Sequence, residues 1–126
     1  MVWVFDGDRP IYLQVMEQLK LGIISGELAP GSRLAAVRDL AAEAAINPNT
    51  MQKALSELER EGLLYTQRTN GRFVTEDSEL ICTLRHQLAK VKLTDFVHQI
   101  HRLGYTISQL SEMLEKVIEE EHRDGK

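Results

Sequence analysis

Polar residues that could read DNA recur at the spacing of one helix face near the middle of the chain. Asn49, Gln52, Lys53 and Ser56 stand at positions i, i+3, i+4 and i+7, and Thr50 flanks them. The opposite face is apolar, with Met51, Leu55 and Leu58. Asparagine and glutamine pair with adenine, lysine meets guanine or phosphate, and threonine meets the thymine methyl group. The pattern indicates a major-groove reading face, although an ordinary solvated face has the same spacing.

A second candidate cluster follows at Arg68-Thr69-Asn70-Gly71-Arg72. Asn-Gly predicts a type I′ hairpin turn, because that turn needs positive φ at both central residues. Alone, the cluster is typical of a simple hairpin with solubilising arginines. Since it directly follows the candidate reading helix, we favour contacts of Arg68, Asn70, Gly71 and Arg72 with phosphates or with the narrow minor groove.

Arg38 is a third candidate, and its own surroundings leave two interpretations open. It could form a surface ion pair with Asp39 or Glu43. It could instead contact DNA from the helix that crosses the phosphate backbone.

The net charge of −4 neither supports nor excludes a nucleic-acid partner. The windows 44–56 and 62–75 contain no acidic residue, and they hold Lys53, Arg68 and Arg72. Because salt screens charge beyond about 8–10 Å, the local balance matters more to a phosphate than the total.

These residues need a helix pair and a hairpin to position them. Asp8 as N-cap and Pro10 in the first turn predict a helix that ends at Ser25-Gly26. Helices follow over about 35–44 and from Pro48, capped by Asn47. Strands are expected at 63–67 and 72–75, so that a winged helix-turn-helix results.

The remaining chain predicts two helices separated by Gly104, with a capping box of Thr106 and Gln109 opening the second. A helix pair has little core of its own, and we therefore expect its apolar residues to meet a second subunit. The expected interface residues are Leu84, Leu88, Phe96, Val97, Leu110 and Leu114. Binding of a small-molecule effector at this interface is a second role that the sequence leaves open.

The expected fold class is thus mainly α with a small β-hairpin. Residues 1–76 are predicted to form the winged helix-turn-helix domain, and residues 77–126 a helical dimerisation segment with room for an effector.

Several function classes find no support in the residues. There is no phosphate loop, no GxSxG elbow and no HExxH motif, so we expect no enzyme and no cofactor. His98 and His101 are read as surface or interface residues, because zinc normally takes four grouped ligands. No apolar run approaches the roughly 20 residues of a membrane span. The single cysteine, Cys82, fits a cytoplasmic location.

The segment 9–76 resembles the N-terminal domain of GntR-family regulators. The resemblance lies in Pro10–Val15, Ser25–Leu34, Val37–Ala41, Asn47–Leu55, Glu59–Leu63 and Gly71–Val74. The Asn-Pro-Asn-Thr start of the third helix and the short C-terminal part are similar to the YtrA-like subfamily. The resemblance implies a homodimer on a two-fold symmetric operator, often a repressor, with DNA contacts at Arg38, the third helix and Gly71.

This chain departs from the family pattern at three places. Ala35-Ala36 stands where many members have Pro-Ser, which removes a helix cap worth about 1 kcal/mol and a phosphate contact. Pro48 and Gln52 stand where relatives often have arginine, so the DNA sequence read should differ. Thr69 replaces a frequent second wing glycine.

We therefore expect a cytoplasmic, dimeric transcriptional regulator that binds double-stranded DNA. The alternative is a winged helix that docks on a protein without specific DNA binding, and the acidic net charge is its best support.

Overall fold

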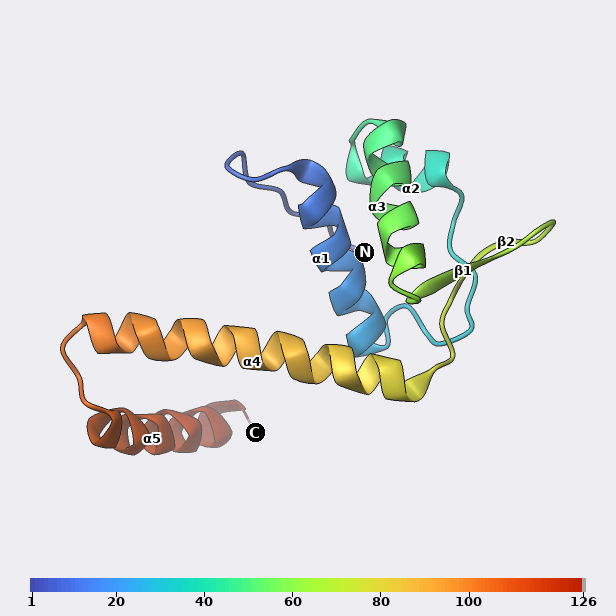
Figure 1. The fold of residues 1–126 in the computed structure, drawn as a ribbon. Coiled ribbons are helices and arrows are strands. Elements are labelled where there is room, and N and C mark those ends of the chain that lie inside the picture. The colour runs from blue at the N-terminus through green and yellow to red at the C-terminus, as the bar shows by residue number, and fades with distance from the viewer. Residues whose placement is uncertain (126) are drawn as a thin grey trace. The chain divides into compact units, whose positions relative to one another are not determined.

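The computed structural model describes residues 1–125 as five helices and one β-hairpin (Figure 1). The elements are α1 (Ile11–Ser25), α2 (Val37–Ala44), α3 (Pro48–Arg60), β1 (Leu64–Gln67), β2 (Gly71–Val74), α4 (Ser78–Arg102) and α5 (Ile107–Gly125). The predicted fold class, mainly helical with a small antiparallel hairpin, is confirmed. The chain forms two compact units, which divide after Arg85.

Helix α3 lies at the centre of the first unit and packs against α1, α2 and β1. Its predicted apolar stripe is buried: Met51, Leu55 and Leu58 are at most 1% exposed. Leu19 and Ile23 of α1 complete this part of the core. The polar face of α3 remains largely exposed, because the core contacts are made by its apolar face.

Helix α1 begins later than predicted. Its N-cap is Pro10, which makes no side-chain cap bond, and Asp8 lies outside the helix. The reason is Gln14, whose buried amide accepts the Asp6 N–H at 2.9 Å and donates to the Asp6 carbonyl at 2.9 Å. These bonds hold the preceding segment in place before the helix starts at Ile11.

The turn between α2 and α3 forms as the sequence predicts. Ala45 ends α2 in the left-handed region, with φ of 59°. Asn47 caps α3 by accepting the Asn49 N–H at 2.7 Å, and Pro48 occupies the first turn, where its missing N–H costs nothing.

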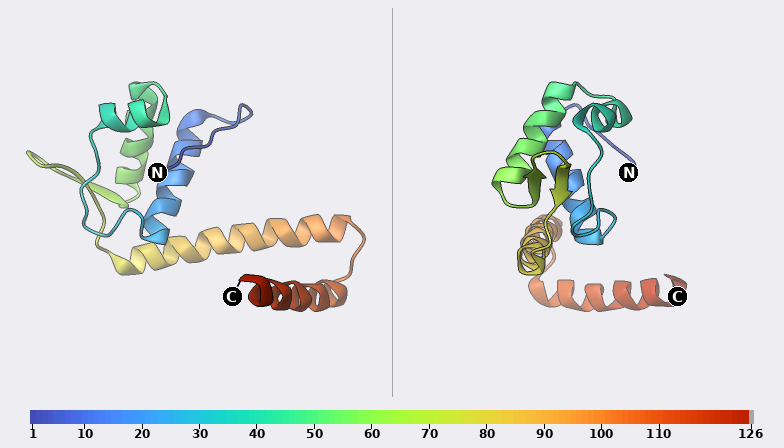
Figure 2. Two further views of the ribbon diagram at one scale, coloured as in Figure 1. Left: turned by 180° about the vertical axis from the view of Figure 1, so that it is seen from behind. Right: turned by 90° about the vertical axis from the view of Figure 1, so that its right-hand side faces the viewer.

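The wing is a hairpin whose turn differs from the predicted type I′. Gln67 pairs with Gly71, and the Asn70 N–H donates to the Gln67 carbonyl at 2.9 Å. Only Gly71 has positive φ, at 100°, so Asn70 does not adopt the conformation that type I′ requires. The loop is therefore three residues long, and it carries the tip of the hairpin away from the helices of its own unit (Figure 2).

A segment before α2, residues 32–34, pairs with strand β2 of this hairpin. The Leu34 N–H donates to the Arg72 carbonyl and the Val74 N–H to the Ser32 carbonyl, each at 2.9 Å. Arg33 and Phe73 form the antiparallel bridge between them. Strand β2 is thus hydrogen-bonded on both edges, which sequence reasoning did not predict because the pairing joins segments far apart in the sequence.

The start of α4 belongs to the first unit. Ile81 is 6% exposed and Leu84 is 8% exposed, so both are core residues there. The compact unit therefore extends to Arg85, past the boundary after residue 76 that the sequence indicated. Leu84 is also removed from the expected dimer interface, since its side chain is buried within its own chain.

The capping box at the start of α5 is present as predicted. The Thr106 N–H donates to Gln109 Oε1 at 2.9 Å, and the Gln109 N–H donates to Thr106 Oγ1 at 3.2 Å. This reciprocal pair explains why the helix restarts directly after Gly104.

Candidate nucleic-acid interface

The predicted reading residues share the outer face of α3. Asn49, Gln52, Lys53 and Ser56 are exposed, and Thr50 is half-buried. None of them is acidic, so these five side chains offer donors and neutral acceptors alone, and the nearest acid on this face, Glu57, is paired with Arg60. This is the side-chain set that the donor and acceptor pattern of the major groove can accommodate.

Gln52 is oriented by its neighbour on the next turn. Its Nε2 donates to Ser56 Oγ at 3.0 Å. The amide keeps one N–H and both lone pairs of its oxygen for a partner, which is the set needed for bidentate pairing with adenine.

Lys53 is held differently from a free surface lysine. Its Nζ lies over the ring of Tyr12 in α1, 3.8 Å from the ring centroid. This cation–π contact positions the ammonium group between α1 and α3. Tyr12 thus supports the candidate interface from α1, a role that the sequence analysis did not identify.

Arg38 makes neither of the ion pairs that its sequence neighbours offered. Among the described residues, no acidic group lies within ion-pair distance of Arg38, and Glu43 contacts the amino group of Met1 instead, at 3.4 Å. Arg38 is exposed and lines a hollow of about 480 Å³ together with Ala36, Val37, Asp39 and Pro48. Its guanidinium is therefore available to an external anion.

A second hollow, of about 260 Å³, lies between the start of α2 and the wing. It is lined by Arg33, Leu34, Ala35, Ala36, Val37, Thr66, Gly71 and Arg72. Because Ala36 and Val37 line both hollows, they join into one concave surface, which we call the backbone groove. The groove runs from the wing to Pro48 at the start of α3.

Arg72 is engaged inside the protein. Its Nε donates to Glu59 Oε1 at 3.2 Å, and its side chain is 19% exposed. Thr66 donates its hydroxyl to the other oxygen of Glu59 at 2.5 Å. The Thr66 bond first, and then the bond and charge of Arg72, lower the pKa of Glu59 against the opposing effect of burial. Glu59 thereby fastens both wing strands to the end of α3.

The wing tip carries the other predicted contacts. Arg68, Thr69 and Asn70 are exposed, and Asn70 Nδ2 donates to Gln67 Oε1 at 3.3 Å. No acidic partner within ion-pair distance of Arg68 is found in the described chain. The structure therefore separates the two wing arginines, with Arg68 open to solvent and Arg72 tied to α3.

The missing cap at α2 has a testable consequence. Ala36 is the N-cap of α2, and it makes no side-chain bond to the first turn. Ala36→Ser should raise the free energy of unfolding by about 1 kcal/mol, because a serine hydroxyl accepts one of the free N–H groups. Chemical denaturation of both proteins measures this difference. Ala35→Ser, one residue outside the cap, is the matched control and should change stability by less than about 0.5 kcal/mol.

The second unit presents apolar surface on both of its helical segments. Phe96 and Val97 of α4 are each 37% exposed, and Leu114 of α5 is 39% exposed. Leu88 and Leu110, the other predicted interface residues, are half-buried. This surface has no cover within its own unit.

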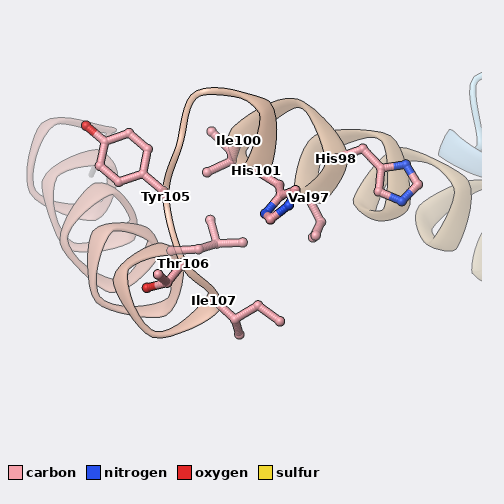
Figure 3. A pocket seen from close by; sticks show the side chains of 8 residues that line it. Val97, His98, Ile100, His101, Tyr105, Thr106 and Ile107 are labelled. Atoms are coloured by element: carbon pink, nitrogen blue, oxygen red, sulfur yellow. The ribbon is translucent and has the colours of Figure 1, made fainter.

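A hollow of about 390 Å³ lies at the turn between α4 and α5. It is lined by Val97, His98, Ile100, His101, Tyr105, Thr106, Ile107 and Leu110. Figure 3 shows Val97, His101 and Ile107 directed toward the same space. The lining is mainly apolar, and its polar groups belong to His98, His101, Tyr105 and Thr106.

In residues 1–125, no three histidine, cysteine, aspartate or glutamate side chains come together in a way that could hold a metal ion. Over the same residues, no helix has both the length and the apolar character needed to cross a membrane.

Comparison with known proteins identifies relatives of the winged part and of the longer chain. The family described as "Bacterial regulatory proteins, gntR family" matches residues 11–74. The HTH-type transcriptional regulator YhcF of Bacillus subtilis is 38% identical over 86% of this chain and 89% of its own length. The HTH-type transcriptional repressor YtrA of the same organism is 33% identical over 86% of this chain and 84% of its own length.

Solved structures agree with these sequence matches. A GntR family transcriptional regulator from Listeria monocytogenes superimposes with a TM-score of 0.82 and 33% identity, covering 89% of this chain and 98% of that chain. The DNA-binding domain of AraR in complex with its operator ORX1 superimposes with a TM-score of 0.53 and 28% identity, covering 57% of this chain and 93% of that chain. Both comparisons favour DNA binding over the protein-docking alternative.

Proposed function

The chain belongs to the GntR family of bacterial regulatory proteins, and we propose that it represses transcription by binding a two-fold symmetric operator as a homodimer. It is a DNA-binding transcriptional regulator and not an enzyme. The observation that carries the proposal is the acid-free stretch 49–56 on the polar face of α3 beside the backbone groove, where Arg38 has no ion-pair partner among the described residues.

In the proposed complex, α3 lies in the major groove, and Asn49, Thr50 and Gln52 reach base edges. Lys53, placed beside Tyr12, meets guanine or an adjacent phosphate. A DNA strand follows the backbone groove, and Arg38 binds one of its phosphates. Most of the affinity in such a contact comes from phosphates, whereas the base contacts select the sequence.

The wing contributes from the other end of the groove. Arg68, Asn70 and Gly71 form the exposed tip and the adjoining turn, and Arg68 carries an unpaired charge that the minor groove attracts. Arg72 holds the wing on α3 through Glu59, so its effect on DNA binding is indirect.

The second unit supports the homodimer. Its exposed apolar residues include three of the predicted interface set, Phe96, Val97 and Leu114, and two more, Leu88 and Leu110, are half-buried. Charge is distributed unevenly as well: in this unit α4 carries three basic residues and one acidic residue, whereas α5 carries six acidic residues and two basic ones. A partner copy could therefore match both the apolar and the charged surfaces.

Two finer assignments follow from the same proposal. The expected site of a small-molecule effector is the hollow at the α4–α5 turn, because Val97 and Leu110 belong both to its lining and to the predicted interface. The expected location is the cytoplasm, where a bacterial operator is found.

The proposal is tested by Arg38→Ala. We expect weaker binding and a smaller slope of log K against log salt concentration, reduced by about one per subunit for the lost phosphate contact. The probe is a duplex recovered from a random DNA pool by the parent protein, and fluorescence anisotropy at several salt concentrations gives the slope.

Arg85→Ala is the matched control for this charge change. Arg85 is exposed and donates to the Ile24 carbonyl at 3.3 Å, at the end of α1 opposite Tyr12 and Lys53. Parent-like binding by the Arg85 variant with a flattened slope for the Arg38 variant supports the proposal. Recovery of no preferred duplex by the parent would favour the protein-docking alternative.

A further inference from the structure

Arg33 occupies a defined place at the base of the wing. Its backbone lies in the segment that is hydrogen-bonded to β2, with the Leu34 N–H on the Arg72 carbonyl and the Val74 N–H on the Ser32 carbonyl. Regular strand-like pairing on both sides fixes the direction in which its side chain leaves the backbone. Arg33 is therefore anchored to the wing, although it lies far from the hairpin in sequence.

The side chain of Arg33 lies against Gly71. A Cβ added at Gly71 would stand 3.1 Å from Nε and 3.5 Å from Nη2 of Arg33. The first of these distances is closer than a side chain normally tolerates, so the guanidinium uses the space that the missing side chain leaves. Gly71 also has φ of 100°. A glycine is therefore needed at this position both for the backbone conformation and for the space that the Arg33 guanidinium occupies.

Arg33 and Arg72, the two arginines at the wing end of the groove, differ in whether an acidic residue neutralises their charge. Arg72 is paired with Glu59 and mostly covered. Arg33 is exposed, and among the described residues no acidic group lies within ion-pair distance of it. Both arginines line the wing end of the backbone groove, but of these two only Arg33 brings an unneutralised charge to it.

From these observations we propose that Arg33 binds a DNA phosphate from the wing base, the role that the sequence suggested for Arg72. Gly71 provides the flat surface on which the Arg33 guanidinium lies. The inference rests on the proposed function, because it names a further contact of the same DNA-binding surface.

The proposed contact is physically favourable for two reasons. A guanidinium presents a planar fork of donors that matches two phosphate oxygens. The paired backbone and the contact with Gly71 restrict the side chain before DNA arrives, so less conformational entropy remains to be lost on binding. Arg33 and Arg38 then hold the DNA strand from opposite ends of the backbone groove.

The test compares Arg33→Gln with Arg72→Gln on two duplexes, one selected by the parent protein and one of random sequence. Arg33→Gln should lower the salt slope by about one per subunit on both, because a phosphate contact is independent of sequence. Arg72→Gln should keep the parent slope and instead lower the midpoint of thermal unfolding, since it removes the partner of Glu59. Arg33→Lys keeps the charge and should retain most of the slope.

Gly71→Ala provides a second, independent measurement. It should displace the guanidinium, so that adding Arg33→Gln to Gly71→Ala causes no further fall in the slope. Circular dichroism of each variant verifies that the helices remain folded. If the double variant instead loses as much further slope as Arg33→Gln loses alone, the proposed role of Gly71 is overturned.

The outcomes also separate this inference from the proposed function. A parent-like slope for Arg33→Gln, or a flattened slope for Arg72→Gln alone, refutes the assignment of Arg33 while DNA binding stands. If the parent itself shows no salt-dependent binding to either duplex, the proposed function fails as well.

Discussion

Leu114→Glu is expected to yield a folded monomer that binds the selected duplex on the order of 100-fold more weakly than the parent. Leu114 lies on the apolar face of α5 and is 39% exposed within its own chain, so the substitution does not disturb the core of residues 1–85. A carboxylate buried without a partner in the subunit interface is strongly unfavourable. Loss of the second subunit removes simultaneous binding to both half-sites, which accounts for the size of the effect.

Light scattering coupled to size-exclusion chromatography measures the mass of each protein, and anisotropy measures DNA binding. Ser108→Glu is the matched control, because it adds the same charge to α5 on the side away from Leu114. The proposed dimer surface is wrong if the Leu114 variant remains dimeric, or if the Ser108 variant dissociates equally.

Leu58→Ala is expected to lower the free energy of unfolding by about 2–5 kcal/mol, the second large effect. Leu58 is 0% exposed and belongs to the stripe of α3 that packs between α1, α2 and β1. Removing three carbons there forfeits transfer free energy and leaves a cavity. Since the free energy of unfolding of natural domains is about 5–15 kcal/mol in total, the loss is a large share of the stability.

Urea denaturation followed by circular dichroism gives the unfolding free energy of both proteins. Ser56→Ala, on the exposed face of the same helix, should change it by no more than about 0.5 kcal/mol. Similar losses for Leu58→Ala and Ser56→Ala would contradict the assignment of α3 as the centre of the core.

Local patterns in the sequence were sufficient to predict that the helices form and which face of α3 is exposed. Asn47 and Pro48 determine where α3 begins, because the cap and the first turn involve only residues close in sequence. The alternation of Met51, Leu55 and Leu58 with polar residues likewise determines which face is buried. The hairpin was predicted for the same reason, from the adjacent pair Asn70-Gly71.

Side-chain hydrogen bonds and strand register, which residue type and spacing do not reveal, decided what the sequence left open or suggested wrongly. Gln14 displaced the start of α1 by binding Asp6 through its side chain, an alternative to the simple cap at Asp8. The wing turn was predicted from the Asn-Gly pair alone, but the observed register of β1 and β2 leaves only Gly71 with positive φ.

The two wing-base arginines show this division most clearly. The sequence determined that a positively charged hairpin would follow a helix whose first part, residues 49–56, is polar on one face and free of acidic residues, because spacing and residue type are local properties. Only the tertiary structure decided that Arg72 forms an ion pair with Glu59. It also decided that Arg33 lies at the same groove, because its backbone pairs with β2. Which of the two arginines keeps an unpaired charge cannot be predicted from sequence spacing, since an ion pair depends on which distant side chains the folded core brings within a few ångströms.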